Sequence, residues 1–291
     1  MLESVYSDLE PLNDREFRDL RKLILEATGI CLKDSKRMLV QARLAKRLRS
    51  LGFASYGAYF DYVTAQPANG DERVELVNSI TTNKTDFFRE NHHFEFLARH
   101  VICQAQERPA SGGLRRLRLW SAGCSSGEEP YSMAITILEK LGSSAGWDIK
   151  ILASDIDTDV LAKADAGVYD GERLSAIPEA TVRKYFRRHA EGGGERFAVN
   201  DHLKALIRFR RINFADAAWP VRTRFDAIFC RNVVIYFDRA TQERLIERLA
   251  TYLEPSGYLI MGHSENLYWV NHLLVPMGNT IYRLREAGPA S

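Results

Sequence analysis

The sequence predicts an α/β domain with a parallel sheet, preceded by a separate helical domain. Within residues 1–80, apolar residues recur only at helical spacing, as in Phe17, Leu20 and Ile24. From Leu114 onward, short apolar strands alternate with helical segments, which is typical of parallel strands joined by crossover helices. A chain of 291 residues is long enough to fold as two domains.

The helical half is expected to contain four helices followed by a linker. Asn13 and Glu16 match a capping box at the start of the first helix, which is expected to end at Gly29. Further helices are expected at residues 35–50, 55–63 and 71–80. Residues 81–90, which begin with the polar segment Thr81–Asp86, are expected to form a linker that contributes to a cofactor site.

The second domain is expected to span residues 91–291 and to begin with a helix at 92–106. Strands are expected at 115–121, 149–154, 207–212, 225–230 and 257–262, with an antiparallel pair near 270–284. Short strands at 185–189, 196–199 and 207–210, grouped around the glycine run 191–194, predict a small antiparallel insertion at about 183–211.

The composition is that of a soluble globular protein, with 45% hydrophobic and 27% charged residues. No apolar run approaches the roughly 20 residues that span a bilayer, and the N-terminus lacks a signal-peptide pattern. The four cysteines are scattered, which argues against a zinc site or a disulfide framework. We therefore expect a cytoplasmic monomer that does not insert into membranes.

Small residues and one acid mark a nucleoside site. The strand at Leu114–Trp120 runs into a loop of Gly, Ser and Ala, and a later strand ends on Asp155. Small residues let a ligand approach the backbone, and a strand-end acid can accept hydrogen bonds from ribose hydroxyls. The loop lacks both a complete Gly-x-Gly-x-x-Gly and a P-loop lysine, so S-adenosylmethionine fits better than a dinucleotide or ATP. A tight turn without a ligand is the alternative.

Polar residues at other strand ends point to the same edge of the sheet. Arg231 and Asn232 follow one strand, with Tyr236 just beyond, and Asn213 and Phe214 follow another. Ligands in open α/β sheets bind at the carboxyl ends of strands, although each pair alone also suits a turn. The segment 82–93 sets Asn, Thr and Arg beside two phenylalanines, which is typical of a pocket rim.

No metal site or cysteine nucleophile is expected. His92 and His93 are adjacent on a helix, so their side chains should point about 100° apart and not bind one ion together. Cys124 and Cys230 have no evident His partner, which favours small core residues.

The second helix carries a basic ridge of Lys36, Arg43, Lys46 and Arg47 beside an apolar face. A solvated surface is the alternative, but only one acid lies nearby. The ridge has no interleaved aromatic residues on which bases could stack, so an acidic protein partner is favoured over nucleic acid.

Taken together, five stretches resemble the CheR family, the chemotaxis-receptor glutamate O-methyltransferases. They occur in family order at Thr81–Arg89, Trp120–Ser132, Ser154–Asp157, Phe229–Asp238 and Gly262–Asn266. The resemblance covers nearly the whole chain. It implies a class I S-adenosylmethionine-dependent methyltransferase (Rossmann-like) fold with a helical N-terminal domain and a small antiparallel β-subdomain inserted in the catalytic domain.

The resemblance also implies particular roles. Arg231 and Tyr236 would help near the point of methyl transfer, and Asp155 would hold the ribose. The receptor's cytoplasmic helical domain would meet Lys36, Arg43, Lys46 and Arg47. The residues implied in binding S-adenosylmethionine, and its product S-adenosylhomocysteine, are Asn83, Thr85, Arg89, Gly123, Glu128, Asp155, Asn213, Phe214, Arg231 and Asn232.

The implied chemistry agrees with the residues present. A glutamate side chain has a reference pKa of about 4.3, so it is ionised at neutral pH and can attack the sulfonium methyl without a general base. The alternatives are a regulator that senses S-adenosylmethionine without turnover and a nucleic-acid methyltransferase. The loop 189–195 lacks a clear Gly-x-Gly motif that some family members use to hold a receptor tail peptide. Receptor recognition through the ridge alone is therefore our hypothesis.

Overall fold

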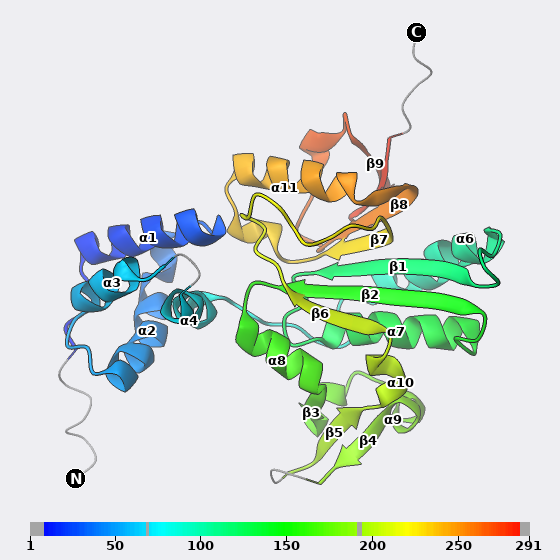
Figure 1. The fold of residues 1–291 in the computed structure, drawn as a ribbon, viewed down its shortest axis with the longest axis horizontal. Helices are drawn as coiled ribbons and strands as arrows, with labels where there is room; N and C mark the ends of the chain where they lie inside the picture. The colour runs from blue at the N-terminus through cyan, green and yellow to red at the C-terminus, as the bar shows by residue number, and fades with distance from the viewer. Residues whose placement is uncertain (1–8, 68–69, 191–193, 286–291) are drawn as a thin grey trace.

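The computed structural model describes residues 9–67, 70–190 and 194–285. It contains a helical N-terminal domain, a linker and an α/β domain with a small sheet at its periphery (Figure 1). None of the helices in the described ranges is both long enough and apolar enough to cross a membrane.

Among its described residues, the N-terminal domain has four α-helices, as expected. The capping box is confirmed, because the Asn13 side chain accepts from the Glu16 N–H at 2.9 Å and the Glu16 carboxylate accepts from the Asn13 N–H at 2.9 Å. The first helix ends at Gly29 in the left-handed conformation. The four helices are α1 (Asp14–Thr28), α2 (Arg37–Leu51), α3 (Tyr56–Ala65) and α4 (Asp71–Ile80).

The segment after the linker was expected to be one helix, but it changes character along its length. It starts as α5 (His92–Phe96), widens into a π-helical turn at Leu97–Val101 and continues as α6 (Ile102–Glu107). The π turn accommodates one extra residue, so the helix buries the same face before and after the turn.

The main sheet has seven strands in the order β6-β2-β1-β7-β8-β10-β9. The first five in this order are mutually parallel. β10 runs antiparallel to both of its neighbours, β8 and β9, so the antiparallel pair expected near the end of the chain is confirmed. β2 and then β6 extend the sheet on one side of β1. The chain then crosses to the other side, where β7 pairs with β1. The strands are β1 (Arg115–Ala122), β2 (Trp147–Asp155), β6 (Ile207–Arg211), β7 (Phe225–Cys230), β8 (Leu253–Met261), β9 (Leu274–Gly278) and β10 (Ile281–Leu284).

Alternation along β1 produces a core on each face of the sheet. Leu117 and Leu119 belong to one buried cluster, whereas Trp120 and Ala122 belong to the other. The first cluster includes Tyr131 of α7 (Glu128–Leu141), and the second includes Leu245 of α11 (Arg239–Thr251). A further helix, α8 (Thr158–Ala166), follows β2.

The small antiparallel sheet exists, but one predicted strand of it is wrong. Its strands are β3 (Val168–Asp170), β5 (Arg196–Val199) and β4 (Phe186–His189), in that order, with α9 (Glu179–Tyr185) and α10 (Asp201–Lys204) beside it. Residues 207–211 instead pair in parallel with β2. The insertion therefore begins before residue 183 and its sheet ends at Val199. Residues 191–193 of the glycine run lie outside the described residues.

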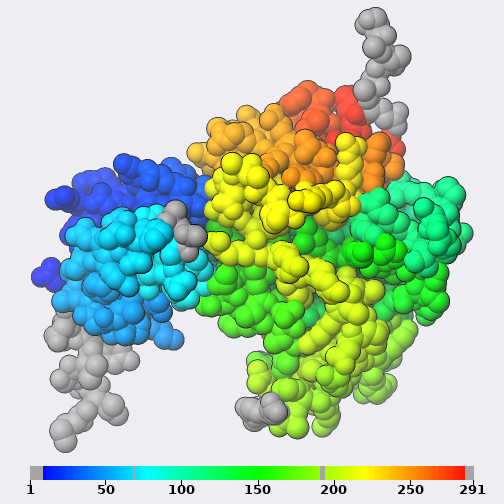
Figure 2. All heavy atoms as spheres, viewed as in Figure 1, coloured from blue at the N-terminus to red at the C-terminus, as the bar shows by residue number. Residues whose placement is uncertain are grey.

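The N-terminal domain lies directly against the α/β domain, as Figure 2 shows. Ile30 forms a β-bridge with Phe237, and the Asn213 side chain donates to the Ala27 carbonyl at 2.7 Å. On the other side, the Asn78 amide donates to the Thr158 hydroxyl at 2.8 Å. These contacts fix the helical domain over the carboxyl ends of the parallel strands.

Candidate active site

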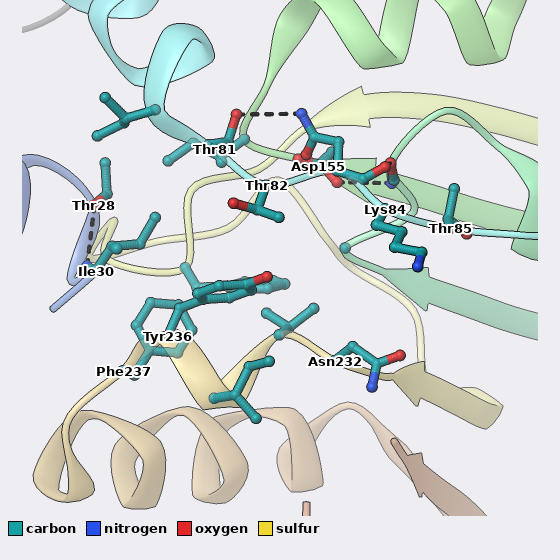
Figure 3. Close-up of a pocket in the computed structure, with 18 of the residues that line it drawn as sticks. Thr28, Ile30, Thr81, Thr82, Lys84, Thr85, Asp155, Asn232, Tyr236 and Phe237 are labelled. Atoms are coloured by element: carbon teal, nitrogen blue, oxygen red, sulfur yellow. Dashed lines mark hydrogen bonds between the residues drawn. The ribbon is translucent and has the colours of Figure 1, made fainter. Parts of the chain in front are cut away.

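A cavity of about 590 Å³ lies where the helical domain meets the strand ends. It is at the point where the chain order reverses between β1 and β7, the usual ligand position in an open α/β sheet. Figure 3 shows the linker residues Thr82 and Lys84 on one side and Tyr236 and Asn232 opposite. Nearly all the predicted site residues come together in the lining of this cavity. They are Asn83, Thr85, Arg89, Gly123, Asp155, Asn213, Phe214, Arg231, Asn232 and Tyr236.

The loop after β1 requires a glycine at its first position. Gly123 has a φ of +94°, and an added Cβ would lie 2.3 Å from Val233 Cγ2. The N–H groups of Gly123 and Cys124 donate to the Ser154 carbonyl at 2.7 and 2.9 Å, which closes the loop onto β2. The backbone is thereby left open to the cavity, as the small-residue pattern predicts.

Asp155 ends β2 at the cavity wall. Its Oδ2 accepts from the Ser125 N–H at 2.8 Å and its Oδ1 accepts from the Asp157 N–H at 3.1 Å. Burial raises the pKa of this carboxyl, while the two N–H donors act in the opposite direction. Each carboxylate oxygen keeps further acceptor capacity, which suits a pair of ribose hydroxyls.

The linker is fastened across the cavity by its polar side chains. The Asn83 amide and the Thr81 hydroxyl both donate to Asp157 Oδ2 at 2.6 Å, and Asp157 also caps α8. The Ser125 hydroxyl donates to the Asn83 carbonyl at 2.8 Å. The side chain of Asn83 is therefore occupied by the fold, although the residue lines the cavity.

Asn232 follows β7 in the left-handed conformation, with φ +58°. Its N–H donates to Glu265 Oε2 at 2.7 Å, and the Gly262 N–H donates to the same oxygen at 2.8 Å. Glu265 lies in a predicted motif but had no assigned role. Its buried carboxylate holds the ends of β7 and β8 together.

Arg231 is buried beneath the cavity, with a side chain only 2% exposed. Its Nη1 lies 2.8 Å from Glu129 Oε2 and its Nη2 lies 3.2 Å from Glu90 Oε2. Nη2 also donates to the Arg89 carbonyl. These contacts make Arg231 a link between β7, α7 and the linker.

The cavity is lined by Glu129 and not by its neighbour Glu128, which the family resemblance implies. The predicted cofactor residue Glu128 is fully buried and does not belong to the cavity lining. Its carboxylate pairs with Arg173 at 2.8 Å and accepts from the Ser126 hydroxyl at 2.7 Å. Glu129, which had no predicted role, lines the cavity instead.

Tyr236 lines the same cavity as Arg89. Burial raises the pKa of its phenol, whereas the Thr82 hydroxyl and the charges of Arg89 and Arg43 act in the opposite direction. The hydroxyl is protonated at neutral pH and can donate a hydrogen bond to a ligand.

Two members of the predicted basic ridge are committed to the fold, so the ridge as a single free surface is wrong. Arg47 binds both oxygens of Glu72 at 3.0 and 2.6 Å, and Arg43 Nη1 donates to the carbonyls of Ile80 and Thr81 at 2.9 and 2.7 Å. Lys36 and Lys46 are exposed. Lys33 and Lys36 also line the cavity.

The sequence argument excluded a shared ion at His92 and His93, but in the structure these two residues form a group with Glu90. One possible ligand atom from each lies within 4.8 Å of the others, and the two imidazole centroids are 4.1 Å apart, so the geometric reason given for excluding them is wrong. The Glu90 carboxylate is already paired with Arg231 and accepts from the His263 N–H at 3.0 Å. A cation would stand beside the guanidinium, so we assign no metal here.

The cysteines fit their expected roles. Cys124 and Cys230 are buried, and burial raises the pKa of each thiol well above its usual value. Both thiols are therefore protonated core groups rather than nucleophiles.

Comparison with known proteins covers both domains. The family model "CheR methyltransferase, all-alpha domain" matches residues 15–81, and "CheR methyltransferase, SAM binding domain" matches residues 83–282. Chemotaxis protein methyltransferase 2 of Pseudomonas aeruginosa is 44% identical, with 92% of each chain covered. The chemotaxis protein methyltransferase of Escherichia coli is 41% identical, with 94% of this chain and 92% of the relative covered.

Proposed function

The chain belongs to the CheR family of S-adenosylmethionine-dependent chemotaxis methyltransferases, and from this premise we propose that it methylates glutamate side chains of chemotaxis receptors. The observation that carries the proposal is the composition of the cavity. It combines a nucleoside-type wall at Gly123 and Asp155 with exposed cations at Lys33 and Lys36. No histidine lines it among the described residues.

The donor set fits S-adenosylmethionine. The Asp155 carboxylate has acceptor capacity for the ribose, and a side chain at Gly123 would fill the space beside Val233. Ile212 and Phe214 supply apolar wall for an adenine ring. We assign Arg89 to the methionyl carboxylate because the residue lines the cavity and its guanidinium has no carboxylate partner among the described side chains.

The reaction needs no general base. The carboxylate oxygen would form a bond to the methyl carbon while the carbon–sulfur bond breaks and leaves its electron pair on sulfur, giving the methyl ester and S-adenosylhomocysteine. The protein's contribution is to hold the acceptor in line and to exclude water. We place Tyr236 beside the transferring group as a hydrogen-bond donor, with Arg231 as support beneath.

The exposed cations on and next to α2 favour an acidic partner. Lys33, Lys36 and Lys46 lie on or next to α2, whose outward face also exposes Met38 and Leu39. A helical receptor domain that carries glutamates would be attracted to this surface before reaction. Methylation removes one negative charge from the bound segment, so the attraction weakens and release of the ester is favoured.

Transfer of labelled methyl from S-adenosylmethionine to receptor-containing membranes tests the proposal. Wild type should give base-labile label, Asp155→Ala should abolish it, and Lys36→Glu/Lys46→Glu should reduce it about tenfold, most strongly at low salt. Lys140→Glu, an exposed change on α7 outside the cavity lining, is the matched control. Base-stable label, or label confined to nucleic acid, would refute glutamate methylation.

A further inference from the structure

Backbone strain is concentrated on both sides of Arg89. Among the described non-glycine residues, only six have positive φ, and Phe88 (+53°) and Glu90 (+58°) are two of them. Neither residue type adopts this conformation readily, because the Cβ clashes with the backbone. Such a conformation persists only where surrounding contacts impose it, and it clusters at functional sites.

The contact before Arg89 comes from α7. The Phe88 N–H donates to the Ser132 hydroxyl at 2.9 Å, and Ser132 is fully buried. The Phe88 ring also packs edge-to-face on Phe94, with centroids 5.4 Å apart. These contacts fix the backbone on one side of the arginine.

The contact after Arg89 is the carboxylate of Glu90. Its Oε2 lies 3.2 Å from Arg231 Nη2 and accepts from the His263 N–H at 3.0 Å. Burial alone would raise the pKa of Glu90, but Arg231 and the His263 N–H outweigh it and hold the pKa below its usual value. The carboxylate is therefore ionised and binds the linker to the ends of β7 and β8.

Between these two contacts, Arg89 is turned toward the cavity. Its carbonyl accepts from Arg231, its Nη1 donates to the Lys84 carbonyl at 3.0 Å, and its side chain lines the cavity. Arg231 is thus bound to both Arg89 and Glu90, and is itself oriented by Glu129.

We propose that Glu90 is a positioning residue, which holds the strained turn that directs the Arg89 guanidinium into the cofactor cavity. The inference rests on the cofactor-binding role proposed above for Arg89 and not on the identity of the methyl acceptor. Glu90 does not line the cavity, so it acts on the ligand through the residues that it holds in place. Its partner Arg231 also lines the cavity, and the proposal assigns the effect of Glu90 to Arg89 rather than to Arg231.

Calorimetric binding of S-adenosylhomocysteine to the full chain tests this, with Arg89→Ala, Glu90→Gln and the double variant compared in one cycle. We expect Arg89→Ala to weaken binding at least about tenfold and Glu90→Gln to weaken it about threefold to tenfold. In the Arg89→Ala background, Glu90→Gln should have no further effect. Glu95→Gln, an exposed change one turn into the next helix, should bind like wild type.

Two results would overturn the inference. One is wild-type binding by Glu90→Gln; the other is an equal loss from Glu90→Gln whether or not Arg89 is present, since that would indicate general destabilisation. Because methyl transfer to receptors is not measured, a failed receptor assay would leave this result unaffected.

A second variant covers the case in which Glu90→Gln does not fold. Ser132→Ala removes the hydrogen bond to the Phe88 N–H without uncovering a buried charge. It should weaken binding in the same direction, by a smaller factor, and this effect should also vanish in the Arg89→Ala background. A Ser132→Ala loss that is unchanged by Arg89→Ala would contradict the proposed coupling.

Discussion

The backbone N–H of Cys31 donates to the carbonyl oxygen of Tyr236 at 2.8 Å, which joins the helical domain to the wall of the active site. Cys31 and Tyr236 both line the cavity, so neither domain encloses it alone. The N-terminal domain therefore forms part of the cavity wall, and under the proposed function it also offers a surface to the receptor. Substitutions in its helices are expected to act in different ways, depending on which side they face.

Gly123→Ala should abolish cofactor binding. The new methyl group would stand 2.3 Å from Val233 Cγ2 at a φ of +94°, so either the loop or the strand end must move. We expect a loss of about 2–3 kcal/mol in the free energy of unfolding. Calorimetry with S-adenosylhomocysteine and urea unfolding measure the two effects.

The matched control for this change is Gly142→Ala. Gly142 also has a positive φ of +72°, but an added Cβ would meet nothing within 4 Å. It should lose only about 1 kcal/mol of stability and keep normal cofactor affinity. Equal losses of affinity in the two variants would show that strain alone, and not the approach to Val233, is responsible.

Arg47→Ala should destabilise the N-terminal domain rather than only weaken receptor binding. It would leave the buried Glu72 carboxylate with the Tyr59 hydroxyl, at 2.8 Å, and without its guanidinium partner. Because Arg47 is partly exposed, we expect a loss of about 2 kcal/mol, measured by urea unfolding. Arg47→Met/Glu72→Gln should recover part of it. Unchanged stability in Arg47→Ala would restore Arg47 to the docking surface.

The basic ridge predicted on α2 illustrates what a sequence can and cannot predict. The helical spacing predicts an apolar face of Val40, Leu44, Leu48 and Leu51 on α2. The first three are buried, but Leu51 at the end of the helix is 41% exposed. The spacing could not show that Glu72 of α4 forms an ion pair with Arg47, because that contact depends on how the two helices pack. A helical wheel treats every residue outside the apolar stripe as exposed.

The same limit explains two other differences. Glu128 and Glu129 both fall in the first turn of α7, about 100° apart, and the position of Arg231, directly after β7, distinguishes Glu129 as the one that lines the cavity. The alternation in Ile207–Arg211 correctly indicated a strand, but it is compatible with either sheet. The strand-end residues were easier to find, since parallel topology alone brings them to one edge.

The affinity for S-adenosylhomocysteine should fall on acidification because of Asp155. Burial raises the pKa of this carboxyl, and only the ionised form offers both oxygens to ribose hydroxyls. Binding should therefore be strongest above the raised pKa and weaken at a higher pH than an ordinary aspartate would give. Calorimetry between about pH 5 and 8 should show this slope in wild type and in the exposed control Asp159→Asn. A slope that survives in Asp155→Asn would assign the titration to another group.

Acid should destabilise the fold through His93. Its side chain is fully buried, with Nε2 2.9 Å from the Asn279 carbonyl oxygen and Nδ1 3.5 Å from Glu90. Burial lowers its pKa to about 4, and the charge of Arg231 adds to this, although Glu90 acts in the opposite direction.

The sign of the effect follows from the direction of that shift. Between the folded pKa of about 4 and the unfolded value of 6.5, the unfolded chain binds more protons than the folded chain. The neutral imidazole therefore contributes its full stability above pH 6.5, and that contribution is lost as the pH falls toward 4. The loss amounts to about 3 kcal/mol at most.

Urea unfolding at pH 7.5 and at pH 4.5 measures this loss. His93→Gln should show a smaller difference between the two pH values than wild type, because glutamine cannot take up a proton. His100→Gln, at an exposed position on the same helical segment, should retain the wild-type difference. If His93→Gln and wild type lose equal stability on acidification, the acid sensitivity comes from the buried carboxylates around Arg231, and His93 serves only to fill the core.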